Sequence, residues 1–252
     1  MTLGTTIKIA NRLLRPLGYE ISRSNRRELH HGTVLPYAER PEFGPSNLDT
    51  KLENVARGHP FEYPDIVKLN QAVVTLVGDA ERICELGCGT GKFATAVVQE
   101  DGRTVVASEY DPATFQWVSE NRAHPRIEYT LGAVPEDAGP FDLLVAIEVI
   151  EHIADYAGFL ETCRRLAPRA LITTPNRARG PETFHAGPPP YPKHVREWTA
   201  GEFYWVLRSF YDRVTLYALP DPLKTNLVRV SVDTSMSSLI ADCRAAATKT
   251  FG

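Results

Sequence analysis

The segment from Ile83 to Gly91, ICELGCGTG, constrains the fold of this chain more than any other part of its sequence. A short apolar run ends in an acid, glycines then alternate with other residues, and residues 92–96 have the composition of a helix. Glycine is needed where the backbone turns sharply and approaches a ligand, because a Cβ atom would collide there. The pattern predicts a strand, a tight loop and a helix, with a ligand held against the loop. Its E-x-G-x-G-x-G spacing differs from the G-x-G-x-x-G of dinucleotide sites.

A second buried strand is predicted over residues 103–108, and Glu109 stands at its end. A nucleotide-binding fold places an acid about twenty residues past the glycine loop, where its carboxylate accepts hydrogen bonds from the ribose hydroxyls. The alternative is an ordinary exposed acid at the end of a strand. Asp111 is expected to cap a helix that begins near Pro112.

The loop spacing and the run Glu109-Tyr110-Asp111-Pro112 together resemble motif I and the next motif of the class I S-adenosylmethionine (SAM)-dependent methyltransferases. The resemblance covers roughly residues 61–233. It implies an α/β fold with a Rossmann-like, doubly wound sheet of seven strands, the last antiparallel, and SAM as the cofactor. The residues that it places at the cofactor are Glu85, Gly87, Cys88, Gly89, Gly91, Glu109, Tyr110, Ala133, Val134 and Ile147.

Within that set the resemblance implies particular roles. Glu109 would bind the ribose, and Tyr110 would lie against the adenine. The backbone of Ala133 and Val134 would meet the adenine edge, and Glu85 would lie near the amine of the methionyl part.

A second informative segment, FDLLVAIEVIEHI, runs from Phe141 to Ile153. It resembles the methyltransferase group that contains the ubiquinone-pathway O-methyltransferases, and LITTPNR (171–177) and HVREWT (194–199) are similar to later signatures of that group. Ligands of open α/β sheets bind beyond the carboxyl ends of the strands, so the acids and histidine of this segment should face the transferred methyl group.

Two chemical hypotheses follow for Glu148, Glu151 and His152, the candidate catalytic residues. In the first, His152 is the general base that removes the hydroxyl proton during direct in-line methyl transfer. In the second, a divalent metal assists. The pattern E-x-x-E-H with a distant histidine resembles the ligands of small-RNA 3′-terminal 2′-O-methyltransferases, which implies that Glu148, Glu151, His152 and His194 hold Mg²⁺ or Mn²⁺. A purely structural role is the third interpretation.

The composition favours some classes of function over others. The 252 residues carry a formal net charge of −3, which disfavours a dedicated nucleic-acid binder. The four cysteines have no metal or disulfide spacing, and no apolar stretch reaches the length of a membrane span, so a cytoplasmic protein with reduced thiols is expected. The leading prediction is a SAM-dependent O-methyltransferase acting on a small molecule, such as a sugar in glycan or natural-product biosynthesis. The alternatives are an RNA 3′-terminal 2′-O-methyltransferase and a non-catalytic SAM-binding protein.

The chain divides into three predicted parts. Residues 1–60 form an N-terminal extension with an amphipathic helix over 5–17, which is interpreted as a lid, as a contact within a homodimer, or as a peripheral contact with an anionic membrane surface. Residues 61–235 form the methyltransferase domain, whose seventh strand is expected over 227–232. Residues 236–252 are expected to form a C-terminal helix or tail. Thr199 and Glu202 are expected to form a capping box.

Overall fold

The computed structural model describes residues 64–100, 102–179, 189, 193–222 and 224–246. The predicted N-terminal extension, including its amphipathic helix, lies outside the described residues. The elements, in chain order, are α3 (Pro64–Thr75), β1 (Arg82–Leu86), α4 (Lys92–Val97), β2 (Thr104–Glu109), α5 (Pro112–Asn121), β3 (Ile127–Leu131), η3 (Glu136–Ala138), β4 (Leu143–Ala146), η4 (Ile150–His152), α6 (Tyr156–Leu166), β5 (Arg169–Pro175), η5 (Arg177–Arg179), α7 (Ala200–Arg208), β6 (Arg213–Ala218), β7 (Val228–Arg229) and β8 (Ser238–Arg244).

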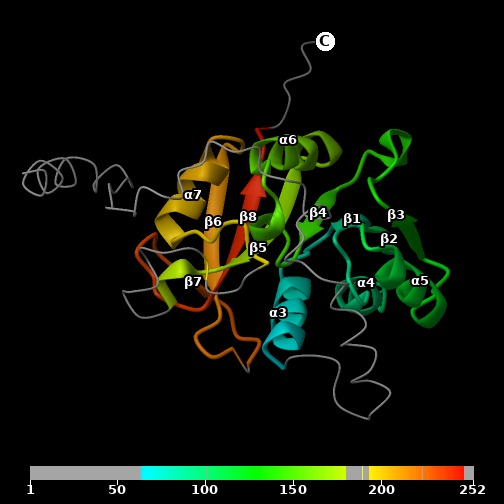
Figure 1. Cartoon of the computed structure of the whole chain (residues 1–252), viewed down its shortest axis with the longest axis horizontal. Coiled ribbons are helices and arrows are strands. Elements are labelled where there is room, and N and C mark those ends of the chain that lie inside the picture. The colour runs from blue at the N-terminus through cyan, green and yellow to red at the C-terminus, as the bar shows by residue number, and fades with distance from the viewer. Residues whose placement is uncertain (1–63, 101, 180–188, 190–192, 223, 247–252) are drawn as a thin grey trace, which may run out of the picture.

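All the described strands belong to one sheet, in the order β3-β2-β1-β4-β5-β8-β6-β7 (Figure 1). The pairs among β1 to β5 are parallel, and β8 lies antiparallel between β5 and β6. The strand order reverses between β1 and β4, which is the point where such sheets bind ligands. The carboxyl ends of β1, β2, β4 and β5 therefore meet at one edge of the sheet.

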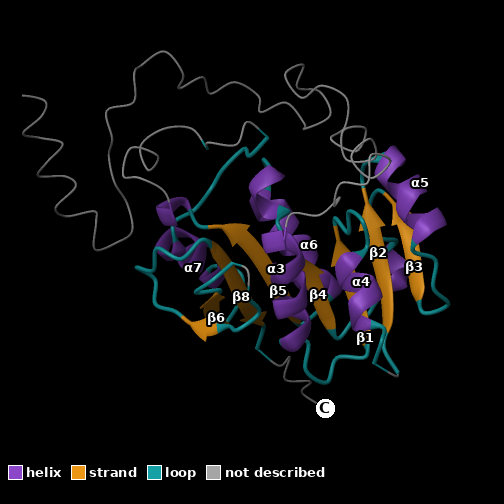
Figure 2. Cartoon of the chain, turned by 90° about the horizontal axis from the view of Figure 1, so that it is seen from below, coloured by secondary structure: helices purple, strands orange, loops and turns teal. Residues whose placement is uncertain are grey.

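Helices cover both faces of the sheet (Figure 2). One hydrophobic cluster joins α3, α4 and α5 to strand residues such as Ile83 and Leu171, and the other joins α6 and α7 to Cys84 and Ile172. Successive residues of β1 and of β5 thus enter opposite cores, as the pleat of a strand requires. Burial on both faces explains why these strands are continuous apolar runs. This architecture confirms the predicted doubly wound α/β fold.

The C-terminal part of the sheet differs from the prediction. The expected seventh strand is only the two-residue edge strand β7, and residues 238–244, predicted as a helix or tail, form the antiparallel strand β8. The sheet therefore has eight strands and extends beyond residue 235. The residues at the start of β8 do not alternate between apolar and polar, because both faces of the strand are buried. Leu239 and Ala241 enter one core, and Ile240 enters the other. A sequence of this kind is ambiguous between strand and helix until its neighbours are known.

Two smaller findings concern membrane-spanning helices and the cysteines. Among the described residues, no helix combines the length and the apolar character that crossing a bilayer requires. The four cysteines are all buried and all free.

Candidate functional site

The glycine loop after β1 takes backbone conformations that side chains resist. Gly87, Gly89 and Gly91 have φ angles of 68°, 52° and 69°. A Cβ on Gly91 would stand 2.8 Å from both the Tyr129 hydroxyl and a Val118 methyl, whereas a Cβ on Gly89 would meet nothing within 4 Å. Gly91 is therefore needed for packing and Gly89 faces open space, which is what a loop that admits a ligand requires.

The carboxylate of Glu109 is hydrogen-bonded to this loop. Its Oε2 accepts a hydrogen bond from the Gly89 amide at 2.9 Å, and its Oε1 accepts from the amides of Tyr110 and Asp111 at 2.7 and 3.0 Å. A carboxylate offers about four acceptor positions, so capacity remains for a hydroxyl donor beside Gly89. The predicted ribose acceptor is thus brought to the glycine loop.

Glu85 is a buried acid at the root of the loop, 3% exposed. Burial raises the pKa of Glu85 to about 8. The charge of Glu109 adds to this increase, and a hydrogen bond from the Ala94 backbone partly opposes it. The Oε2 atom of Glu85 is buried and has no hydrogen-bond partner among the described residues. A buried acceptor without a donor is costly, and an ammonium group of the methionyl part would supply one. The loop, Glu109 and Glu85 therefore fit SAM.

The predicted adenine side lies at the ends of β2 and β3. Tyr110 is 68% exposed and Ala133 is also exposed, whereas Val134 is half-buried and packs against the α6 and α7 core. Ile147, half-buried after β4, packs against the opposite core. Cys88 is buried, and its amide donates to the Ser108 carbonyl at 2.9 Å, so it ties the loop to β2.

The segment after β4 presses directly on the glycine loop. A Cβ on Gly87 would stand 2.8 Å from a methyl of Val149. Just before Val149, Glu148 has a φ of 54°, the only positive φ of a non-glycine among the described residues. The hydroxyl of Thr173 on β5 accepts from the Glu148 amide at 2.9 Å and donates to its Oε1 at 2.9 Å. Such strain is characteristic of functional sites and needs this kind of support.

Glu148 and Glu151 are held by neighbouring threonines of β5. Thr173 binds Glu148, and the Thr174 hydroxyl donates to Glu151 Oε2 at 3.1 Å. Consecutive strand residues point to opposite faces, so the two carboxylates are held by threonines whose side chains leave β5 on opposite faces. Burial raises the pKa of Glu148 to about 7. Burial, followed by the charge of Glu148, raises the pKa of Glu151 well above its usual range.

Glu151 meets both predicted histidines. Glu151, His152 and His194 offer ligand atoms that all lie within 4.8 Å of one another. The two imidazole rings are edge to face, with centroids 4.8 Å apart. The amides of Val195 and Arg196 donate to the Glu151 carbonyl at 2.8 and 3.2 Å, which brings the segment of His194 to η4. The fourth predicted ligand, Glu148, is not part of this group.

The donor set suits a divalent cation. Glu151 is fully buried, and its Oε1 has no hydrogen-bond partner among the described residues. A carboxylate with an unsatisfied oxygen beside two imidazoles is a ligand set that binds transition-metal ions such as Mn²⁺. The three residues therefore fit a metal ion.

The Nδ1 atom of each histidine already faces an acceptor. His152 Nδ1 lies 3.0 Å from the carbonyl oxygen of Lys193, and His194 Nδ1 lies 2.6 Å from Glu197 Oε1. A carbonyl oxygen can only accept, so His152 Nδ1 carries a proton and, in the neutral ring, Nε2 carries the lone pair. Metal-binding histidines are commonly held in this way by a carbonyl or a carboxylate.

Sequence reasoning missed Glu197. Glu197 is buried, and Arg179 contacts both of its oxygens at 3.2 and 3.3 Å. Burial alone would raise the pKa of Glu197, but the hydrogen bonds from His194 and Arg179 outweigh it and hold that pKa below its usual value. An acid three residues after a candidate histidine, in HVREWT, was the available signal.

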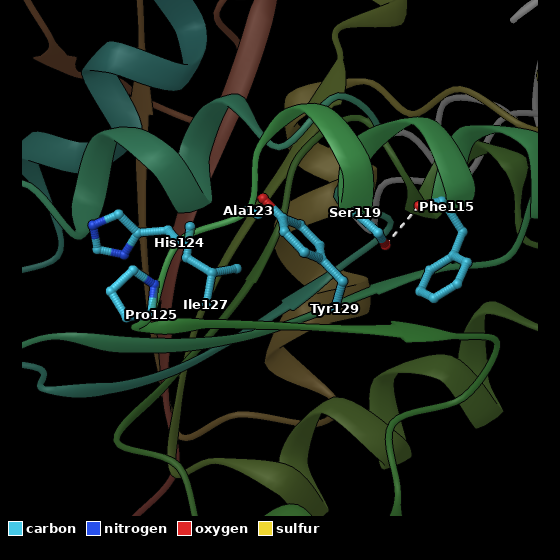
Figure 3. Close-up of a pocket in the computed structure, with 7 residues that line it drawn as sticks. All are labelled: Phe115, Ser119, Ala123, His124, Pro125, Ile127 and Tyr129. Carbon is cyan, nitrogen blue, oxygen red and sulfur yellow. Dashed lines mark hydrogen bonds between the residues drawn. The ribbon is translucent and has the colours of Figure 1, made fainter.

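A cavity of about 560 Å³ lies elsewhere, between α5 and the edge strand β3 (Figure 3). Its lining residues are Phe115, Ser119, Ala123, His124, Pro125, Ile127 and Tyr129. None of the predicted site residues lines it, so it is separate from the carboxyl-end site.

Known proteins resemble this chain over much of its length. A model of a methyltransferase domain family matches residues 36–220, beginning inside the predicted N-terminal extension. A probable S-adenosylmethionine-dependent methyltransferase of Mycolicibacterium smegmatis is 33% identical over 135 residues, which cover 50% of this chain and 50% of that protein. A ubiquinone biosynthesis O-methyltransferase of Caulobacter sp. strain K31 is 34% identical over 107 residues, or 38% of this chain and 41% of that protein.

The chain thus spans about half the length of the curated relatives it matches. Among solved structures, small RNA methyltransferase HEN1 aligns with a TM-score of 0.58 and 15% identity, over 71% of this chain and 25% of that one. That likeness shows the fold alone.

Proposed function

Because this chain belongs to the methyltransferase domain family, we propose that it transfers a methyl group from SAM to a hydroxyl of a small molecule. The name of a relative, a ubiquinone biosynthesis O-methyltransferase, supports oxygen as the acceptor atom. SAM, when bound, supplies a methyl group on a positively charged sulfur. Glu109 would accept hydrogen bonds from the ribose hydroxyls and Glu85 would accept from the amine. The open side of Gly89 would give room for the ligand.

The observation that carries the proposal is the convergence of Glu151, His152 and His194, whose ligand atoms lie within 4.8 Å of one another. We propose that these residues hold a divalent cation. Two imidazoles with one carboxylate suit Mn²⁺ better than Mg²⁺, which prefers oxygen ligands. A cation held there would lower the pKa of a hydroxyl and orient it.

The same geometry supports His152 as a base. Its Nδ1 is held at 3.0 Å by the Lys193 carbonyl, so in the neutral ring Nε2 carries the lone pair that takes the hydroxyl proton. Both roles place the acceptor hydroxyl at the end of β4, beside the glycine loop. They differ in whether activity requires a metal.

The first experiment is calorimetric titration of Mn²⁺ and Mg²⁺ into the full chain saturated with S-adenosylhomocysteine. We expect saturable binding, tighter for Mn²⁺, that is lost in Glu151→Gln. The matched control is Glu161→Gln, the same change at an exposed residue of α6. Equal metal binding by wild type and Glu151→Gln would remove Glu151 from the proposed site.

The acceptor is tested with radiolabelled SAM and a panel of sugars, catechols and a single-stranded RNA with a free 3′ end. We expect methylation of small-molecule hydroxyls, because the net charge of −3 disfavours a polyanionic acceptor. Transfer to the RNA alone would replace this proposal with the 2′-O-methyltransferase alternative. Binding of S-adenosylhomocysteine without transfer to any acceptor oxygen would favour a binding protein.

A further inference from the structure

Glu197 occupies a position that no role in cofactor binding explains. Its side chain is 1% exposed, yet it lies between the guanidinium of Arg179 and the imidazole of His194. The His194 side chain is itself only 10% exposed, and the distance from its Nδ1 to Glu197 Oε1 is 2.6 Å. A short contact of this kind is typical of a charge-assisted hydrogen bond.

We propose that Glu197 is a positioning residue, which holds the proton of His194 on Nδ1 and so leaves the lone pair of Nε2 to act at the site shared with Glu151 and His152. The inference rests on the proposed function for the identity of that site. An ionised carboxylate can only accept hydrogen bonds, so its partner Nδ1 must donate. His152 is held in the same tautomer by a backbone carbonyl, which no substitution can remove. The Nδ1 atom of His194 instead faces a side chain, the carboxylate of Glu197, which a substitution can change.

Hydrogen bonds from neighbouring residues hold the Glu197 side chain in place. Arg179 grips its two oxygens through two nitrogens and also donates to the Asn176 carbonyl at 3.0 Å. Asn176 forms an isolated parallel bridge with Trp198, the residue next to Glu197. The side-chain Nδ2 of Asn176 donates to the carbonyls of Thr234 and Met236, both at 2.8 Å. The end of β5 therefore orients Glu197 through a continuous set of hydrogen bonds.

The direct test is the tautomer of His194, read from nitrogen-15 shifts and long-range proton couplings of the full chain labelled at histidine. The measurement uses a pH at which the imidazole is neutral and needs neither metal nor acceptor. We expect the proton on Nδ1 of His194. A proton on Nε2 in the wild-type protein would overturn the proposal without recourse to any variant.

The matched perturbation is Glu197→Gln, with Glu161→Gln as the control. Whichever way a glutamine amide is turned, one of its N–H donors faces a donor of Arg179 or His194, so the Nδ1–H form loses its advantage. We expect the Nε2–H form of His194 to become populated, His152 to stay unchanged, and Mn²⁺ affinity to fall about 10–100-fold. Binding of S-adenosylhomocysteine reports that the variant is folded.

The outcomes separate the two proposals. A tautomer change in Glu197→Gln, in a protein that binds no Mn²⁺, would support Glu197 as the positioning residue and count against the metal site. Mn²⁺ binding by wild type, with the tautomer and affinity unchanged in the variant, would keep the metal site and overturn the role of Glu197.

Discussion

The glycines of the loop after β1 should separate folding from ligand binding. Gly91→Ala places a Cβ 2.8 Å from both the Tyr129 hydroxyl and a Val118 methyl, at a φ of 69°. The left-handed conformation costs about 1–2 kcal/mol for alanine. Overpacking against buried neighbours adds about 1–3 kcal/mol. The Tyr129 hydroxyl donates to the Arg122 carbonyl at 3.2 Å and cannot move away freely. We therefore expect the free energy of unfolding to fall by about 2–5 kcal/mol.

Gly89→Ala in the same loop should behave in the opposite way. Its φ is 52° and its Cβ would meet nothing within 4 Å. Its stability cost is only that of the left-handed conformation, about 1–2 kcal/mol. The space that its Cβ enters is the proposed place of SAM, so we expect affinity for S-adenosylhomocysteine to fall by at least tenfold. Gly102→Ala is the control, because it has a φ of 86°, no atom within 4 Å and a position before β2, away from the site.

The assays are urea unfolding followed by far-ultraviolet circular dichroism and calorimetric titration with S-adenosylhomocysteine. The reasoning requires Gly91→Ala to be the least stable of the three variants, and Gly89→Ala to match Gly102→Ala in stability while losing affinity. Equal destabilisation by Gly89→Ala and Gly91→Ala would refute the steric argument. Unchanged affinity in Gly89→Ala would refute the placement of the ligand against the loop.

Two further predictions test ionisable groups in the interior. The pKa of Glu85 rises from 4.5 to about 8 on folding, so between these values the folded chain keeps a proton that the unfolded chain has released, and stability falls as pH rises. In Glu85→Gln, the free energy of unfolding should fall less steeply between pH 5 and 8, by up to about 1.4 kcal/mol per pH unit. An unchanged dependence of this free energy on pH would contradict the raised pKa of Glu85. Asp242 on β8 accepts from Arg169 at 2.9 and 3.1 Å. Asp242→Asn should cost about 3 kcal/mol by the same assay, and a neutral effect would question the pairing of β8 with β5.

Local sequence signals determined much of the fold because they act over a few residues. Asp111 caps α5 by accepting from the Thr114 amide, and Thr199 with Glu202 forms the capping box of α7, both as predicted. The match of residues 36–220 to a methyltransferase domain family confirms the relationship that the glycine loop indicated. Each of these features depends on neighbours in the chain, so the residue types are enough to predict it.

The tertiary structure decided what depends on distant partners. Residues 238–244 form a strand because β5 and β6 supply hydrogen bonds on both sides and two cores bury its two faces. The sequence by itself identified Glu151, His152 and His194 as candidates, but only the folded chain brings them together and separates Glu148 through the alternation of Thr173 and Thr174. Burial and hydrogen bonding between segments far apart in sequence set these positions, and no local pattern encodes them.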